Sequence, residues 1–240
     1  MRTMWIIAGM RRSGIHAVTN WMRTSLATAG EPHVLLNNVR LLRFNSKSEN
    51  VVFSDNYVST GPGSEHILIV FEDKLLRRID ESPLPKNIGA DRYRRLVVVR
   101  DPYNLAASRL QKRRRRGNTN MPLSRLATMW PDHALPGESW VQCIYNHWVR
   151  DEDHRRQVAE SLALPSCPPA PDSVARAGDG SSFDGLRYDG RAGEMQVLDR
   201  WRNFADDPEF LSHVNQPQLA ELSERVCGFP NPLKEAAVDS

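Results

Sequence analysis

Two arginines, a serine and a histidine gather near the start of the chain, within the run Gly9-Met10-Arg11-Arg12-Ser13-Gly14-Ile15-His16. These side chains suit an anionic ligand, because guanidinium and hydroxyl groups donate hydrogen bonds to phosphate or sulfate oxygens. The apolar run Trp5–Ala8 precedes the first glycine and is typical of a buried strand. Helical spacing of apolar residues begins at Ile15. We refer to Gly9–Gly14 as the glycine loop.

A strand, a glycine loop and a helix in this order point backbone N–H groups at one place, where the helix dipole also favours an anion. The glycine spacing matches the G-x-x-x-x-G-K-[ST] pattern of nucleoside triphosphatases, but Ile15 replaces the lysine and His16 the magnesium-binding hydroxyl. Such an enzyme would lose its phosphate-binding lysine and its metal anchor together. The alternative is a tight turn with two solvated arginines. We predict a metal-free anion site formed by Arg11, Arg12, Ser13, Gly14, Ile15 and His16.

A second pair of anion-binding side chains lies at the end of another apolar run, Arg95–Val99. Arg100 follows this run directly, and Ser108 stands eight residues later, about two helical turns along. Asp101 is suited to cap that helix, with Pro102 in its first turn. An arginine fork and a hydroxyl at one sheet edge would each hold a phosphate oxygen. A salt-bridging arginine and an ordinary helix serine are the alternative.

Taken together, the Arg-Ser-Gly of the glycine loop and the strand, Arg-Asp-Pro and Ser108 resemble the sulfotransferases that use 3′-phosphoadenosine 5′-phosphosulfate (PAPS). The resemblance covers roughly the first half of the chain. It implies that the glycine loop holds the 5′-phosphosulfate, with Arg12 at the sulfate, and that Arg100 and Ser108 hold the 3′-phosphate. It also implies sulfuryl transfer to a hydroxyl or amine of a small molecule or glycan, with adenosine 3′,5′-bisphosphate as product and no metal.

The chain also departs from that family's pattern. Ile15 lacks the hydroxyl that often follows the loop glycine, and His16 in the next place is suited to donate to the 5′-phosphate or the sulfate. The usual lid motif, Gly-x-x-Gly followed by Asp-Trp, is matched only in part, by 190–193 and 199–201. Within the Pro- and Gly-rich segment 164–193 we expect Arg187 and Arg191 to close over the nucleotide.

Transfer to a hydroxyl or amine needs a group that takes the proton of the acceptor. The apolar run His66–Phe71 delivers Glu72 and Asp73 to the carboxyl end of a buried strand, where ligands bind in parallel sheets. Glu72 is therefore our expected base and His16 its rival, while Arg12 neutralises the leaving group. The alternative for Glu72 or Asp73 is a capping role at the next helix.

The elements that must position these residues alternate between strand and helix along the chain. The apolar runs that read as strands are Trp5–Ala8, His33–Leu36, His66–Phe71 and Arg95–Val99, with Val51–Phe53 as a possible short strand. Helical patterns are expected over 138–161, Met195–Phe204 and Pro217–Cys227. We predict one domain over 1–240, a three-layer α/β/α fold with a central parallel sheet, similar to P-loop NTPases.

The composition of the chain bears on its partners and its location in the cell. The net charge of +3 is too small to indicate a nucleic-acid partner, and no apolar run is long enough to span a membrane. Three scattered cysteines and the absence of a leader-like start favour a cytoplasmic protein. The alternatives to a sulfotransferase are a P-loop nucleoside or small-molecule kinase and a nucleotide-binding protein without catalysis. The acceptor and the oligomeric state stay open.

Overall fold

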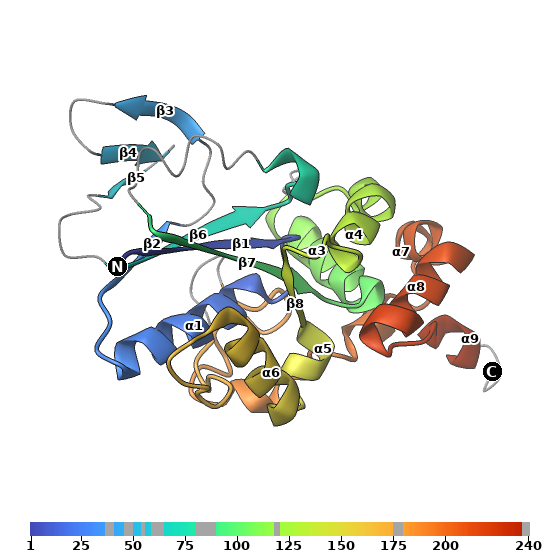
Figure 1. The fold of residues 1–240 in the computed structure, drawn as a ribbon. Helices are drawn as coiled ribbons and strands as arrows, with labels where there is room; N and C mark the ends of the chain where they lie inside the picture. Colours follow the sequence, from blue (N-terminus) through green and yellow to red (C-terminus); the bar gives the residue numbers. More distant parts are fainter. Residues whose placement is uncertain are drawn as a thin grey trace.

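The fold is built on a sheet of five parallel strands in the order β2-β6-β1-β7-β8. The structure is a computed structural model that describes residues 1–36, 41–45, 50–53, 56–58, 65–79, 90–117, 121–174 and 180–236. The strands of this sheet are β1 (Thr3–Gly9), β2 (His33–Leu36), β6 (His66–Glu72), β7 (Arg92–Val99) and β8 (Val141–Ile144). A separate antiparallel sheet contains β3 (Leu41–Asn45), β4 (Asn50–Phe53) and β5 (Asn56–Val58) (Figure 1).

Helices follow most strands. The α-helices are α1 (Ile15–Thr28), α3 (Pro102–Arg116), α4 (Leu126–Ala134), α5 (Tyr145–Trp148), α6 (Glu152–Leu162), α7 (Pro208–Val214), α8 (Pro217–Cys227) and α9 (Pro232–Ala236). The short 3₁₀ turns are η1 (Leu76–Arg78), η2 (Leu123–Arg125), η3 (Ala192–Glu194) and η4 (Arg200–Phe204). The predicted helix Pro217–Cys227 is confirmed as α8.

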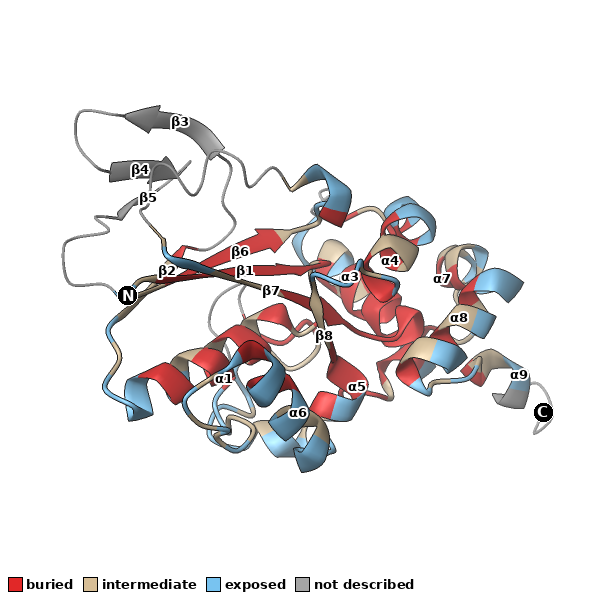
Figure 2. Ribbon diagram, in the orientation of Figure 1, coloured by how far each residue is buried: buried red, intermediate tan, exposed pale blue. Residues whose placement is uncertain are grey.

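Helices cover both faces of the sheet, so the predicted three-layer α/β/α fold is confirmed (Figures 1 and 2). Strand β1 shows how the sequence produces this arrangement, because all seven of its residues are buried. Trp5 and Ile7 pack with α1 and α6, whereas Ala8, on the other face, packs with α3 and α4. A strand that is apolar on both faces is stable only between two helical layers.

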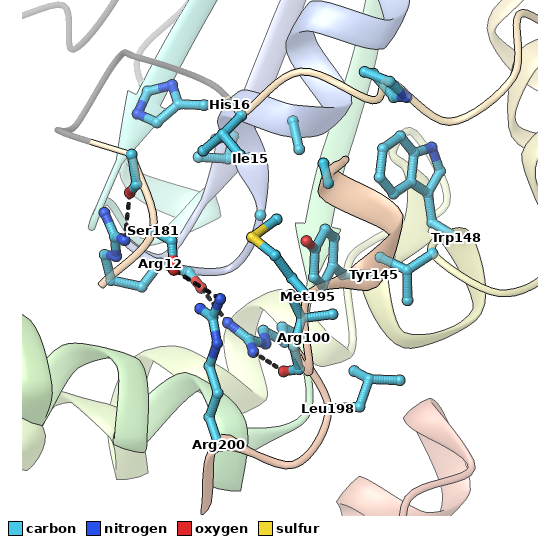
Figure 3. Close-up of a pocket in the computed structure, with 18 of the residues that line it drawn as sticks. Arg12, Ile15, His16, Arg100, Tyr145, Trp148, Ser181, Met195, Leu198 and Arg200 are labelled. Carbon is cyan, nitrogen blue, oxygen red and sulfur yellow. Dashed lines mark hydrogen bonds between the residues drawn. The ribbon is translucent and has the colours of Figure 1, made fainter. Parts of the chain in front are cut away.

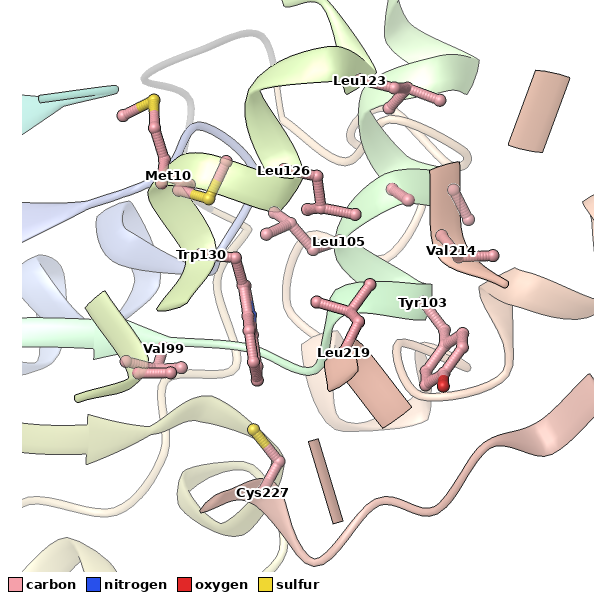
Figure 4. Close-up of a cluster of buried hydrophobic side chains, with 14 of the residues drawn as sticks. Met10, Val99, Tyr103, Leu105, Leu123, Leu126, Trp130, Val214, Leu219 and Cys227 are labelled. Atoms are coloured by element: carbon pink, nitrogen blue, oxygen red, sulfur yellow. The ribbon is translucent and has the colours of Figure 1, made fainter. Parts of the chain in front are cut away.

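Trp130 of α4 links the larger core to the end of β7. Its ring is 1% exposed and packs among side chains from β7, α3 and α8 (Figure 4). Its Nε1–H donates to the backbone oxygen of Arg100 at 2.7 Å. A buried indole N–H needs such a partner. Trp130 therefore fixes the strand end that carries Arg100.

The register of the sheet brings the predicted site residues to one edge. Gly9 at the end of β1 pairs with Glu72 on one side and with Val98 on the other. Val99 in turn pairs with Ile144 of β8. Because all these strands are parallel, their carboxyl ends and the loops that follow lie together.

One sequence-based expectation about elements is confirmed in part and another is wrong. Segment 138–161 is mostly helical, through α5 and α6, but the strand β8 precedes these helices and was not expected. Met195–Phe204 is not a continuous helix, since only the 3₁₀ turn η4 forms at its end. The backbone oxygens of Val197 and Leu198 instead accept hydrogen bonds from Arg100 and Asn104, so this stretch is held by side chains of the sheet edge.

Candidate functional site

A cavity of about 510 Å³ opens at the carboxyl ends of the strands. Its volume falls within the range of sites that enclose a drug-sized ligand. Most of the residues predicted from the sequence line it, namely Arg11, Arg12, Gly14, Ile15, His16, Glu72 and Arg100. Figure 3 shows Arg12, Ile15, His16 and Arg100 around this cavity. The two predicted anion-binding motifs therefore face one common space.

The glycine loop has a backbone that depends on Gly14. Gly14 has φ of 93°, in the left-handed region, and precedes the first turn of α1. A Cβ at this position would lie 2.2 Å from the ring of Tyr145. Arg12 also has a positive φ, of 76°, which is uncommon for a residue with a side chain. The loop is thus held in a strained conformation against an aromatic wall, as functional loops often are.

Asp73 anchors the glycine loop from the neighbouring strand end. Its carboxylate accepts from the backbone N–H of Arg11 at 3.0 Å and pairs with the fully buried Arg109 at 2.7 Å. Its own N–H donates to the backbone oxygen of Gly9 at 3.1 Å. Asp73 therefore shapes the loop, and its carboxylate is fully engaged in doing so.

Glu72 and His16, the two candidate bases, touch each other. His16 Nε2 lies 3.2 Å from Glu72 Oε1, and Arg11 Nε lies 3.6 Å from Glu72 Oε2. The side chains of Glu72 and His16 are 10% and 16% exposed, and both residues line the cavity. The arrangement is a carboxylate flanked by an imidazole and a guanidinium at the mouth of the glycine loop.

Arg100 and Ser108 are joined as the sequence predicts. Arg100 Nη1 lies 3.1 Å from Ser108 Oγ and also donates to the backbone oxygen of Arg12 at 3.1 Å. Both residues are buried, and burial lowers the pKa of Arg100, an effect that Tyr145 and Asp101 partly offset. Within the described part of the chain, Arg100 Nε has no hydrogen-bond partner. A buried guanidinium with a spare donor favours an anionic ligand nearby.

A buried polar network holds the end of β7 and the segment opposite it. Asp101 caps α3 as predicted, with Asn104 N–H donating to its carboxylate at 2.8 Å. Asn146 Nδ2 donates to the same carboxylate at 2.9 Å. Asn104 then reaches across to Leu198, donating to its backbone oxygen at 2.9 Å. Because these groups satisfy one another, segment 195–201 is fixed against the site.

Arg200 is a site residue that sequence reasoning missed. It lines the cavity, is 7% exposed, and its Nη1 lies 3.4 Å from Ser108 Oγ. Figure 3 shows its guanidinium beside that of Arg100. The only sequence signal was the partial lid motif at 199–201, in which Arg200 stands between the Asp and the Trp that the family pattern has side by side. Burial and then repulsion from Arg100 lower the pKa of Arg200 to about 9.

Aromatic rings form the wall of the cavity next to these arginines. Tyr145 and Trp148 stack with ring centroids 5.8 Å apart and an interplanar angle of 18°. Arg100 Cζ lies 5.5 Å from the centroid of the Tyr145 ring. Met195 and Val197 add apolar surface to the same cavity. Such a wall suits the flat, weakly polar face of a nucleobase.

Four of the predicted residues do not line the cavity. Ser108 lies behind Arg100, and Ser13 is 1% exposed with its Oγ under Gly9. Arg187 and Arg191, which we expected over the nucleotide, are exposed and lie beside the ring of Tyr188 at 5.7 and 5.5 Å. Arg200, not these two, is the cation that this part of the chain brings to the cavity.

The Pro- and Gly-rich segment 164–193 runs along the cavity, although its residues 175–179 lie outside the described part. Its Pro171, Val174 and Gly180 are among the lining residues. Trp21 Nε1 donates to the backbone oxygen of Pro168 at 2.7 Å, which ties one end to α1. Arg12 Nη2 donates to the oxygen of Gly180 at 2.8 Å, which ties the middle of the segment to the glycine loop.

Neither a metal centre nor a bilayer-spanning helix is found among the described residues. No group of three or more His, Cys, Asp or Glu side chains in those ranges is arranged to hold a metal ion. None of the helices placed there is both long and apolar enough to cross a bilayer. In the comparisons with known proteins, no protein-family model and no curated protein matches this chain.

Proposed function

We propose that this protein is a PAPS-dependent sulfotransferase, which moves a sulfuryl group to the hydroxyl or amine of a small molecule or glycan. One observation carries the proposal: Arg100, which lies 3.1 Å from the buried Ser108 hydroxyl, lines the same cavity as the glycine loop. Two anion-binding motifs in one cavity suit a nucleotide that carries phosphate at both its 5′ and 3′ positions. ATP would use only one of them.

In this proposal, different residues of the chain have different roles in the sulfuryl transfer. The glycine loop and Arg12 bind the 5′-phosphosulfate and stabilise the negative charge that grows on the leaving phosphate. Arg100 and Ser108 hold the 3′-phosphate, and the wall of Tyr145 and Trp148 takes the base. The attacking oxygen or nitrogen forms a bond to sulfur as the bond from sulfur to the 5′-phosphate oxygen breaks, which releases adenosine 3′,5′-bisphosphate. No residue in this scheme requires a metal.

We propose that the His16–Glu72 pair takes the proton from the acceptor hydroxyl or amine, with His16 as the base. Both oxygens of Glu72 already face nitrogen atoms, His16 Nε2 on one side and Arg11 Nε on the other. If His16 donates Nε2–H to Glu72, its Nδ1 carries the lone pair that accepts the proton. Glu72 then stabilises the imidazolium that forms.

We also propose that the protein works in a reducing compartment such as the cytoplasm, because Cys143, Cys167 and Cys227 are free.

A thermal-shift comparison tests this function. Adenosine 3′,5′-bisphosphate at ~100 times its dissociation constant should stabilise the fold by about 2.7 kcal/mol, or roughly 5 to 10 °C for a chain of this size. At the same concentration, adenosine 5′-monophosphate and ATP with magnesium should stabilise the fold much less. A larger shift with ATP and magnesium would favour the kinase alternative. Tight bisphosphate binding with no turnover of PAPS on any acceptor would favour a binding protein without catalysis.

A further inference from the structure

Arg200 reaches the Arg100–Ser108 pair from the far end of the chain. Its Nη1 lies 3.4 Å from Ser108 Oγ, and its Nη2 lies 2.9 Å from Ser181 Oγ. Two guanidinium groups and two hydroxyls therefore converge on one buried point. Arg200 belongs to neither of the motifs on which the proposed function depends.

The position of Arg200 is fixed by the backbone around it. Asn104 donates to the backbone oxygen of Leu198 at 2.9 Å and accepts from the N–H of Trp201 at 3.2 Å. These two bonds bracket Arg200 and tie it to the first turn of α3. The Arg200 guanidinium also lies 5.1 Å from the ring centroid of Phe183. A side chain held at this many points is preorganised, so little conformational entropy is lost when a ligand binds.

Each of the two guanidiniums has one carboxylate nearby, Asp101 for Arg100 and Asp184 for Arg200. Arg100 and Arg200 are 2% and 7% exposed, and repulsion between such desolvated cations is strong. Asp184 lies 3.3 Å from Arg200, yet the repulsion from Arg100 affects the pKa of Arg200 more than the attraction of Asp184 does. A doubly negative group placed between the two guanidiniums would relieve this repulsion. A neutral group, or a hydroxyl in place of a phosphate, would not.

We propose that Arg200 is a specificity-determining residue, which together with Arg100 selects nucleotides that carry a dianionic phosphate at the Ser108 hydroxyl. This inference depends on the proposed function, because it assigns that phosphate to the 3′ position of the nucleotide. Ser181 helps to position Arg200, because its hydroxyl accepts from Arg200 Nη2 and donates to Asp184. Asp184 competes with the phosphate for Arg200 and keeps the unliganded site from being more strongly cationic.

Calorimetric titration of adenosine 3′,5′-bisphosphate and adenosine 5′-monophosphate tests the inference. Arg200→Gln should weaken bisphosphate binding by roughly 30- to 1,000-fold, as expected when a buried charged partner is removed. It should change binding of the monophosphate by less than about threefold, because that nucleotide does not reach Arg200. Arg202→Gln is the matched control, since Arg202 lies two residues away with a side chain that is 68% exposed and pairs with Asp199. It should leave both affinities unchanged.

A second variant separates charge recognition from a purely structural role. Asp184→Asn removes the competing carboxylate and keeps the shape of the Ser181–Asp184 turn, so bisphosphate binding should hold or tighten. If Arg200 only braced that turn, Asp184→Asn would weaken binding as Arg200→Gln does, and the inference would be overturned. It would also be overturned if Arg200→Gln weakened both nucleotides equally. Should Arg200→Gln not fold, Arg200→Lys keeps the charge without the fork and should lose affinity for the bisphosphate selectively.

Failure of the inference can be told apart from failure of the proposed function. Wild-type protein that binds the bisphosphate no better than the monophosphate would overturn both. Wild-type protein that prefers the bisphosphate, together with an Arg200→Gln variant that keeps this preference, would overturn the role of Arg200 alone and leave Arg100 and Ser108 as the residues that read the phosphate.

Discussion

His16 Nε2 lies 3.2 Å from Glu72 Oε1, although His16 lies in the first turn of a helix and Glu72 ends a strand more than fifty residues later. The contact follows from the register of the sheet, in which Gly9 pairs with Glu72. From the sequence these residues were rivals for one role. In the folded protein they form a pair.

The first prediction separates their roles. If His16 accepts the proton, His16→Gln should lower turnover by roughly a hundred- to ten-thousandfold while bisphosphate affinity changes by a factor of a few. Glu72→Gln, which keeps a hydrogen-bond acceptor for His16, should cost less than His16→Gln. Steady-state kinetics with calorimetric binding on both variants measures this. A dead Glu72→Gln variant beside an active His16→Gln variant would return the base to Glu72.

The second prediction concerns Arg12. Arg12→Ala should lower turnover by roughly a hundred- to thousandfold, the loss expected for one preorganised donor at the leaving group, and weaken nucleotide binding less. Arg187→Ala is the matched control, because Arg187 is exposed and lies outside the cavity. It should keep nearly full activity. Equal losses in the two variants would mean that segment 164–193 closes over the nucleotide and carries Arg187 into the site.

How much of the fold and of the site can be predicted from the sequence depends on how far apart in the chain the interacting residues lie. Continuous apolar runs such as His66–Phe71 identify buried strands, because a strand covered on both faces has few other compositions. Strand β8 was missed because it is a four-residue edge strand that contains Gln142. Short edge strands have weak patterns of their own, and pairing with a neighbour decides them.

The residues of the candidate site also differ in how well the sequence predicts their contacts. Arg100 and Ser108 are eight residues apart on one strand–helix unit, so local geometry predicts that they meet. Arg200 stands 92 residues from Ser108 and is placed by the backbone bonds of Asn104 to Leu198 and Trp201. No local pattern encodes such a contact. Arg187 and Arg191 are expected at the nucleotide because they lie in a Pro- and Gly-rich segment, and such a composition does not indicate the direction in which a side chain points.

The third prediction tests the contact between the glycine loop and Tyr145. Gly14→Ala should destabilise the fold by roughly 2–5 kcal/mol, because a Cβ meets the Tyr145 ring at 2.2 Å in addition to the cost of a positive φ. Gly117→Ala is the control, since Gly117 has φ of 59° with nothing within 4 Å. It should cost only about 1–2 kcal/mol. Urea unfolding of both variants measures the difference, and equal costs would mean that Tyr145 moves aside freely.

The fourth prediction concerns Asp73. Asp73→Asn leaves the fully buried Arg109 without its counter-charge and should cost about 3–5 kcal/mol of unfolding free energy. Glu194→Gln, which breaks an exposed ion pair with Arg191, should cost about 0–1 kcal/mol. Because Asp73 also holds the Arg11 N–H, the Asp73→Asn variant should bind the bisphosphate more weakly even where it is folded. Stability and binding near wild type would show that the loop keeps its shape without this anchor.

The last prediction is a pH dependence that follows from Arg200. Its pKa is lowered to about 9, mainly by burial and then by repulsion from Arg100, so the free protein begins to lose this proton as the pH rises through 9. A bound dianion favours the charged form and raises that pKa. Binding of adenosine 3′,5′-bisphosphate at pH 9 to 10 should therefore take up as much as about one proton, and affinity should fall as the pH rises through this window. Below about pH 8, Arg200 is already charged in both the free and the bisphosphate-bound protein, and this uptake should vanish.

Calorimetry at pH 9.5 in buffers of different ionisation enthalpy measures the proton uptake directly. The Arg200→Gln variant should lose it, whereas Arg202→Gln should retain it. Equal uptake in wild type and Arg200→Gln would assign the proton to another group and remove Arg200 from contact with the phosphate.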